Sequence, residues 1–454
     1  MTPLSARRRY MLVSLLTWLP PGLMMAPMVL LMTERGLSIS QVGAVMAVYS
    51  AVSVALELPT GGLADVVGRR VVLSASAAFT AAGLSLMVVA DSFLLFAVGA
   101  VLKGAARALS SGPAEAWYVD TLHTLEGPDA DLKPGLSRGH AMESVALCGG
   151  TLAGGLVPPV VPGGLAVPPA MGAGAAVLLL VVALFALPEP PHARRGLGEV
   201  LRAVPTTVVT GLRMALLDVV LRRLMPIAAV FGVALVAVEL LTPVRLAALT
   251  GEAETGATAY AFVAAIGFAA SALGSALAPR IAVLLGGSAG GSGSGTVRGS
   301  AGGAVAGTVG GSVAGTVRGS VCGAAAGIVV TALSLAALAA TAGLTGAAGL
   351  VSAGLAYAGM FTGLSINALL LSELTHLRVT AAERATMTSV SSMSLQAGAG
   401  LANLGLASLA LGLGTAGAWW PAAALVLASA LLLVRLPALQ PSVLASQPDG
   451  LRPV

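Results

Sequence analysis

Charged side chains within long apolar segments are the residues of this chain best suited to chemistry. Lys103 and Arg107 lie four residues apart in one apolar segment, and Glu239 lies inside another, VALVAVELLTP. Four-residue spacing puts both cations on one face of an α-helix. A charge inside a membrane span costs at least about 2.5 kcal/mol on insertion scales, so it normally faces a cavity or a partner. These residues therefore predict a polar site inside a membrane.

Carboxylates at such a site are candidates for carrying a proton, because burial and nearby cations adjust their pKa in opposite directions. Glu57 and Glu143 lie near the cytoplasmic ends of apolar segments, where partial solvation and an arginine partner would also explain them. Lys103 and Arg107 could equally snorkel or pair with Glu57 or Glu115. The candidates for proton coupling or cavity lining are therefore Glu57, Lys103, Arg107, Glu115, Glu143 and Glu239.

Uncharged side chains supply further candidates for the cavity wall. Met24 and Met28 could form a soft surface for varied ligands, although methionine is more often ordinary lipid-facing filler. Asn367 and Gln396 could line the cavity or form hydrogen bonds between helices. Pro20 and Pro21 are expected to kink or locally unwind the first helix.

The elements that position these residues follow from composition. Of the 454 residues, 57% are hydrophobic and 9% are charged, with a mean hydropathy of +0.93. A soluble protein carries about a quarter charged residues, so a cytosolic enzyme, a disordered chain and a nucleic-acid binder are excluded. A span needs roughly 20 apolar residues. Twelve such segments occur, at about 10–32, 40–60, 71–90, 93–114, 141–161, 166–187, 223–243, 257–277, 322–344, 347–371, 385–411 and 416–436.

The distribution of Lys and Arg predicts the orientation of these spans. If the N-terminus is cytoplasmic, all 24 basic residues fall on the cytoplasmic side except Arg35, Arg245, Lys103 and Arg107. This bias follows the positive-inside rule. The arginines before the first segment could suggest a secretory signal, but the segment is long and eleven others follow it, which favours a retained helix. We expect a multi-pass protein of the cell's inner (cytoplasmic) membrane with both termini cytoplasmic, and no nucleic-acid partner.

A polar stretch divides the chain into two halves. The prediction is an N-terminal six-helix bundle (1–187), a cytoplasmic linker (188–222), a C-terminal six-helix bundle (223–436) and a cytoplasmic tail (437–454). Two six-helix halves with a site between them recur among transporters. The Gly/Ser-rich insert 286–320, in which GTVRGS occurs twice, is expected to be flexible.

The loop at 61–70, GGLADVVGRR, resembles the signature loop of the major facilitator superfamily, with Val66 in place of the first basic residue. The resemblance implies two six-helix bundles that rock around a central cavity. It also implies that Gly61, Asp65, Gly68, Arg69 and Arg70 act in the conformational switch and not in substrate contact. A helix cap with positive-inside anchors explains Arg70 equally well.

Two other segments extend the resemblance. Gly104, Arg107, Ser111 and Gly112 are similar to the family's fourth-span arginine motif, which is linked to proton coupling, although the usual Gln is missing. The glycines at 149, 150, 154 and 155 resemble a degenerate antiporter motif, but close helix packing explains them better.

No set of residues suggests catalysis. The four histidines are scattered without ligand spacing, Cys148 and Cys322 have no partner motif, and no phosphate-binding G-x-x-x-x-G-K-[ST] sequence occurs. The sequence predicts an all-α integral membrane protein without catalytic residues, metal or cofactor. The predicted function is that of a monomeric secondary transporter that uses the proton gradient to export a small amphipathic compound. A proton-independent uniporter, an importer of a metabolite, or a membrane sensor without transport are the alternatives.

Overall fold

The computed structural model describes residues 1–61, 63–127, 130–188, 213–286, 304–379, 384–434 and 436; of these, the side chains of 58, 59, 61, 65, 66, 304–316 and 384–386 are left aside. Its elements are all helices. The first half contains α1 (Pro3–Met25), α2 (Met28–Glu34), α3 (Ile39–Gly61), α4 (Leu63–Val67), α5 (Arg69–Val89), α6 (Phe93–Ser110), α7 (Pro113–Glu126), α8 (Lys133–Leu156), η1 (Gly164–Ala166) and α9 (Val167–Ala186). The second half contains α11 (Leu221–Thr250), α12 (Ala253–Gly286), α13 (Ala304–Ala340), α14 (Gly346–His376), α15 (Arg384–Ser429) and η2 (Ala430–Leu433).

Length and hydropathy make most of these helices membrane spans. Within the described residues, nine helices are long and apolar enough to cross a bilayer, or ten when α1 and α2 count as one bent span. The helix α15 has 46 residues and breaks at Gly414, whose φ of +74° favours glycine. Its two parts are together long enough for two spans. The all-α membrane fold is confirmed. The count of twelve spans stays a prediction, with which the described helices are consistent.

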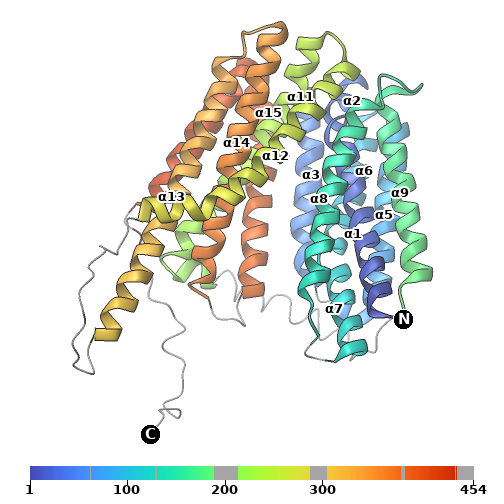
Figure 1. Cartoon of the computed structure of the whole chain (residues 1–454). Coiled ribbons are helices and arrows are strands. Elements are labelled where there is room, and N and C mark those ends of the chain that lie inside the picture. The colour runs from blue at the N-terminus through green and yellow to red at the C-terminus, as the bar shows by residue number, and fades with distance from the viewer. Residues whose placement is uncertain are drawn as a thin grey trace.

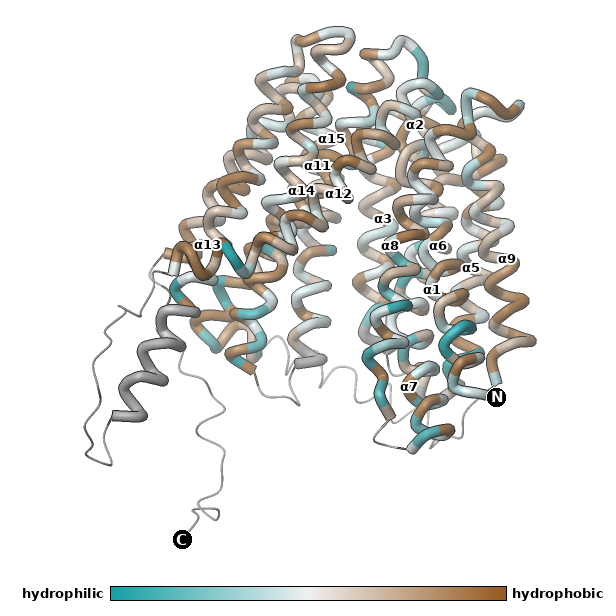
Figure 2. The backbone as a smooth tube through the Cα atoms, viewed as in Figure 1, coloured by the Kyte–Doolittle hydropathy of each residue, from teal (hydrophilic) through white to brown (hydrophobic). Residues whose placement is uncertain are grey.

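The helices pack as two bundles that stand side by side (Figure 1). Helices α1, α3, α5, α6, α8 and α9 contact one another, and so do α11 to α15. Small residues allow close approach, as expected in lipid. A Cβ at Gly150 would lie 2.9 Å from the backbone N of Leu23, so α8 packs directly on α1. Hydrophilic residues gather toward the end of the first bundle that carries the N-terminus, along α7 and the start of α8 (Figure 2).

The two bundles meet mainly at the end of the molecule away from the N-terminus and diverge toward the other end (Figure 1). At that contact, Thr258 of α12 donates a hydrogen bond of 2.6 Å to the carbonyl of Gly155 in α8. Gly43 of α3 packs against the backbone of Asn403 in α15. Helices α3 and α15 also touch nearer the N-terminal end, where Ser392 Oγ donates to Glu57 Oε1 over 3.2 Å.

Two local expectations need correction. The first span breaks at Ala26 and Pro27, with a bend of 47°, while Pro20 and Pro21 lie inside α1. Pro27 cannot donate a backbone hydrogen bond, and the chain restarts as α2 directly after it. The helix α13 begins at Ala304, within the insert expected to be flexible. Alanines and valines recur among the glycines of this stretch and continue the apolar composition of the span that follows. Residues 287–303 of the insert, most of the linker and the tail from 437 lie outside the described residues.

Candidate functional site

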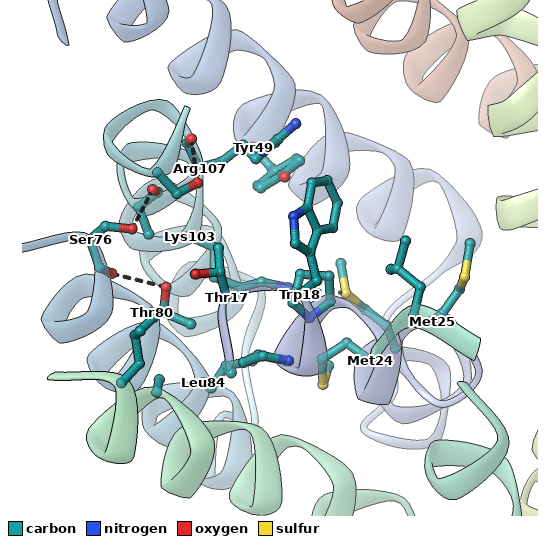
Figure 3. A pocket seen from close by; sticks show the side chains of 18 of the residues that line it. Thr17, Trp18, Met24, Met25, Tyr49, Ser76, Thr80, Leu84, Lys103 and Arg107 are labelled. Atoms are coloured by element: carbon teal, nitrogen blue, oxygen red, sulfur yellow. Dashed lines mark hydrogen bonds between the residues drawn. The ribbon is translucent and has the colours of Figure 1, made fainter. Parts of the chain in front are cut away.

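A cavity of about 390 Å³ lies within the first bundle, next to α11 of the second. Six helices of the first bundle and the short helix α2 contribute to its wall, and Glu239 completes it from α11. The lining residues that matter for its chemistry are charged, hydroxylated, aromatic or sulfur-containing: Thr17, Trp18, Met24, Met25, Met28, Met46, Tyr49, Ser76, Thr80, Lys103, Arg107, Ser110 and Glu239. Figure 3 shows the hydroxyl side chains of Ser76 and Thr80 at one end of the view and Met24 and Met25 at the other, with Trp18 between.

Helix α6 carries both cations of the cavity, one helical turn apart. Gly104 lies between them and allows α6 to press on α3, since a Cβ there would lie 2.8 Å from the carbonyl O of Tyr49. Lys103 Nζ lies 3.4 Å from Met28 Sδ and 5.9 Å from the centre of the Tyr49 ring. Arg107 Cζ lies 4.9 Å from the centre of the Trp18 ring. Neither cation forms an ion pair with any carboxylate that the structure describes.

Glu239 is the acidic member of the lining. It is half-buried within α11 and interacts electrostatically with three tyrosines, Tyr49 of α3, Tyr260 of α12 and Tyr357 of α14. The hydroxyls of Tyr260 and Tyr357 are hydrogen-bonded at 2.9 Å. Glu239 therefore lies where helices of the two bundles meet, and a charge change there is felt by both.

The hydroxyl groups of three serine and threonine residues around the cavity donate hydrogen bonds to nearby backbone carbonyls. Ser76 donates to the carbonyl of Ala106 over 2.8 Å, and Thr17 donates to the carbonyl of Val13 over the same distance. Ser110 donates to the carbonyl of Arg107, also over 2.8 Å. Their oxygen lone pairs remain as acceptors, and the cationic donors of this wall are the nitrogens of Lys103 and Arg107.

Of the predicted site residues, the structure brings Met24, Met28, Lys103, Arg107 and Glu239 together in this cavity. The other predicted residues lie elsewhere.

Asn367 is buried between α14 and α13, where its amide donates to the carbonyl of Ala324 over 2.8 Å. Gln396 is half-buried on α15 and does not contribute to the cavity wall. Glu115 is exposed on α7, and Glu143 lies 3.3 Å from the Nδ1 of His140. Glu57 accepts its hydrogen bond from Ser392 outside the cavity. None of these five lines the cavity, because their helices turn them toward other neighbours or toward solvent. A coupling role for the three glutamates stays a prediction.

The predicted switch residues form a separate cluster at the end of the first bundle. Gly68 caps α5 with a φ of +95°, which favours glycine. Arg69 Nε donates to Asp120 Oδ2 of α7 over 2.6 Å, and Arg70 donates to the carbonyl of Leu184 in α9. Gly61 ends α3, and the side chain of Asp65 lies outside what the structure describes. The switch role of this cluster stays a prediction.

Sequence reasoning missed Trp18 and Tyr49 as cavity residues and Asp120 as the partner of Arg69. Trp18 carried a usable signal, because tryptophan in membrane helices concentrates at the interfaces and this one lies inside a span. Tyr49 offered the same signal. The pairing of Asp120 with Arg69 depends on the approach of α7 to α5, which no local pattern encodes.

A second ion pair lies at the corresponding end of the second bundle. Arg378 lies just after α14, and Asp218 lies just before α11. The Nε of Arg378 donates to Oδ2 of Asp218 over 3.1 Å. Burial alone would raise the pKa of Asp218, but the hydrogen bonds from Arg378 and from the backbone amides of Leu221 and Val220 outweigh it and lower that pKa. Sequence analysis did not anticipate this pair.

No metal site is found in the part of the chain that the structure describes, because no three His, Cys, Asp or Glu side chains gather there. The cavity instead offers two cations, one carboxylate and two aromatic side chains. It also has a methionine wall, formed by Met24, Met25, Met28 and Met46. Such a set can bind and release a small molecule and can move a proton at Glu239, but it has no activated nucleophile.

Comparison with known proteins places this geometry in context. The family model described as Major Facilitator Superfamily matches residues 10–363. No curated protein matches the sequence. Among solved structures, the chain resembles the nucleoside transporter NupG with a TM-score of 0.70 at 13% identity, covering 94% of this chain and 98% of that one. It resembles a POT family transporter bound to a thioalcohol-conjugated peptide with a TM-score of 0.65 at 13% identity, covering 94% and 95%. It resembles the D-xylose-proton symporter with a TM-score of 0.64 at 13% identity, covering 97% and 98%. At such identities the likeness shows the fold alone.

Proposed function

The chain belongs to the Major Facilitator Superfamily, and from that premise we propose that this multi-pass membrane transporter, which is not an enzyme, exports a small amphipathic compound in exchange for protons. The proton gradient across the inner membrane would drive it, with no bound cofactor, and the working unit would be the monomer. The observation that carries this proposal is the cavity in which Glu239 of the second bundle meets Lys103 and Arg107 of the first.

Proton coupling requires a carboxylate whose environment changes between the two states of the cycle. Glu239 is such a group, because it belongs to one bundle and lines a cavity built mainly by the other. Rocking of the bundles would alter its distance from Lys103 and Arg107, and with it the free energy of ionisation. This position favours Glu239 over Glu57, Glu115 and Glu143, which lie outside the cavity wall.

Alternating access is supported by the way the bundles meet. They touch through Gly155 and Thr258 at one end and, beyond the contact of Ser392 with Glu57, diverge at the end that carries the N-terminus. With the N-terminus cytoplasmic, as the positive-inside rule predicts, this arrangement faces inward. The Arg69–Asp120 pair lies at the same end, where rearrangement must occur when the cavity closes.

The second candidate function is import or uniport of a metabolite. The similarity in fold to the D-xylose-proton symporter supports this alternative, because that protein couples its protons to a sugar in the same direction. Proton movement against the substrate indicates the proposed exchange, proton movement with the substrate indicates import, and substrate flux without proton movement indicates proton-independent uniport.

Flux in proteoliposomes with an imposed pH gradient tests the proposal. For a transported compound found in a panel of amphipathic molecules, the substrate gradient should drive proton movement in the opposite direction. Glu239→Gln should abolish this proton flux and retain exchange of labelled for unlabelled substrate, because the amide cannot carry a proton. Glu252→Gln, at an exposed position after α11, is the matched control and should behave as the wild type. Proton flux that survives Glu239→Gln, or that runs with the substrate, would contradict the proposal.

A further inference from the structure

We propose that the cavity selects an organic anion: a compound with one acidic group bound by Lys103 and Arg107 and an apolar body lying against the methionine wall. This inference rests on the proposed transport function and names its substrate class. It begins with the charge of the lining, where two cations face one carboxylate.

The two cations are placed to receive an acidic group. In the described structure each lacks a carboxylate partner, and each is held by soft contacts, Lys103 by a thioether and Arg107 by an indole face. The described ion pairs elsewhere differ, since Arg69 and Arg378 each bind an Asp. Keeping a cation without an anion in a membrane interior costs free energy, and a bound anion would reduce this cost.

Spacing supports joint recognition of one group. Lys103 and Arg107 are four residues apart on α6, so their side chains share one helix face. The oxygen atoms of a carboxylate or phosphonate can accept a hydrogen bond from each at once, and such charge-assisted bonds are stronger than neutral ones. Gly104 lets α6 pack closely on α3, which holds the helix that carries both cations in place.

The remainder of the lining fits an apolar body. Met24, Met25, Met28 and Met46 line the same cavity as the cations, and Trp18 lies between the hydroxyl end and the methionines (Figure 3). Methionine and tryptophan accommodate aliphatic and aromatic groups of varied shape. About 390 Å³ is within the range of pockets that hold drug-sized molecules.

The opposite class, an organic cation drawn to Glu239, fits the lining less well. A cation would meet two like charges on α6 for the single carboxylate on α11. The proposed export of an anion is also favoured by an inside-negative membrane potential, which acts on each charge moved.

The test compares three compounds that share one skeleton and differ in charge: 4-phenylbutyrate, 4-phenylbutanamide and 4-phenylbutylamine. Binding to the detergent-purified full-length chain is measured by isothermal titration calorimetry, which does not require transport. We expect the carboxylate to bind at least about tenfold tighter than the amide, as hydrogen bonds to charged groups allow, and the amine to bind no tighter than the amide.

Variants assign the preference to the two cations. Lys103→Gln and Arg107→Gln should each weaken carboxylate binding about tenfold and leave amide binding within about twofold, so retained amide binding reports an intact cavity. Arg107→Lys, which keeps the charge, should retain most of the affinity for the carboxylate. Lys133→Gln and Arg222→Gln, at exposed positions outside the cavity, are the matched controls and should leave both affinities unchanged.

Equal binding of carboxylate and amide, a preference for the amine, or an equal loss in the Lys133→Gln and Arg222→Gln controls would overturn the anion site. The transport proposal fails separately. Anion binding without any flux in proteoliposomes supports the site and contradicts transport, whereas proton-coupled flux of other compounds without anion binding contradicts the site and supports transport.

Discussion

Two groups of charged residues that the structure describes differ in their partners. Arg69 with Asp120 and Arg378 with Asp218 form ion pairs near the ends of the two bundles, where both members are only partly buried. Lys103, Arg107 and Glu239 lie within spans and line a cavity. Paired charges near a helix end stabilise a conformation, while unpaired charges at a cavity are available to a ligand or a proton.

The pair between Asp218 and Arg378 should make stability depend on pH. Because the folded state lowers the pKa of Asp218 below its ordinary value of 3.8, the ionised carboxylate contributes stability above that value and loses it as the pH falls through the lowered native value. Asp218→Asn should therefore reduce the stability of the purified protein at neutral pH by about 1 kcal/mol.

Thermal unfolding across a pH series measures this effect. The difference in Tm between wild type and Asp218→Asn should be constant at neutral pH and shrink once the pH falls below 3.8. Asp91→Asn, at an exposed carboxylate, serves as the control and should not change Tm at any pH. A difference that grows on acidification would contradict the assigned direction of the pKa.

At the scale of elements, glycines determine how closely the helices approach. Gly104 presses α6 on α3 and so sets the place of the two cavity cations, while Gly150 presses α8 on α1. Gly155 differs in that it joins the bundles, since a Cβ there would lie 2.6 Å from the carbonyl O of Ala257 in α12. Helix packing thus explains the fifth-span glycines Gly150 and Gly155, and Gly155 lies at the contact between the bundles.

A larger residue at Gly155 should separate the bundles at the end away from the N-terminus. Gly155→Leu is expected to favour the state in which the cavity faces that end, because the backbone carbonyl of Ala257 cannot yield locally. Transport should fall at least about tenfold, as interconversion is biased toward one state by a few kcal/mol. Gly149→Leu, on the same helix where a Cβ would meet nothing within 4 Å, is the control.

Labelling reports the conformation directly. With Cys148 and Cys322 replaced by serine, Thr258→Cys places a single thiol at the contact with Gly155. A membrane-impermeant maleimide should label it several times faster in the Gly155→Leu background than in the Gly149→Leu background. Equal labelling in both would show that this contact does not control access.

At the scale of the whole molecule, the orientation in the membrane determines which end of the cavity faces the cytoplasm. The distribution of Lys and Arg predicts that the start of α8 is cytoplasmic and that the turn between α11 and α12 is external. Lys133 and Glu252 are exposed at these two places.

Single cysteines at these positions test the orientation. In a background without Cys148 and Cys322, an impermeant maleimide should label Glu252→Cys in intact cells, and Lys133→Cys only after the cells are permeabilised. The reverse pattern would place the N-terminus outside and turn the inward-facing arrangement into an outward-facing one.

The sequence by itself determined the class of this protein. A helix in lipid must satisfy its own backbone hydrogen bonds, so hydropathy over about 20 residues is enough to identify spans. The same local reasoning identified Lys103, Arg107 and Glu239, because a charge inside a span is conspicuous without knowledge of its neighbours. The signature at 61–70 likewise predicted the family.

Only the tertiary structure decided which of the polar residues share a site. Glu57, Glu115, Glu143, Asn367 and Gln396 are polar residues in or beside apolar segments, yet they lie outside the cavity. The rotation of each helix about its axis, and its approach through glycines such as Gly104, fix which side chain faces which. These quantities depend on contacts between segments far apart in the chain, so local patterns do not encode them. The Asp218–Arg378 pair emerged only from the folded arrangement.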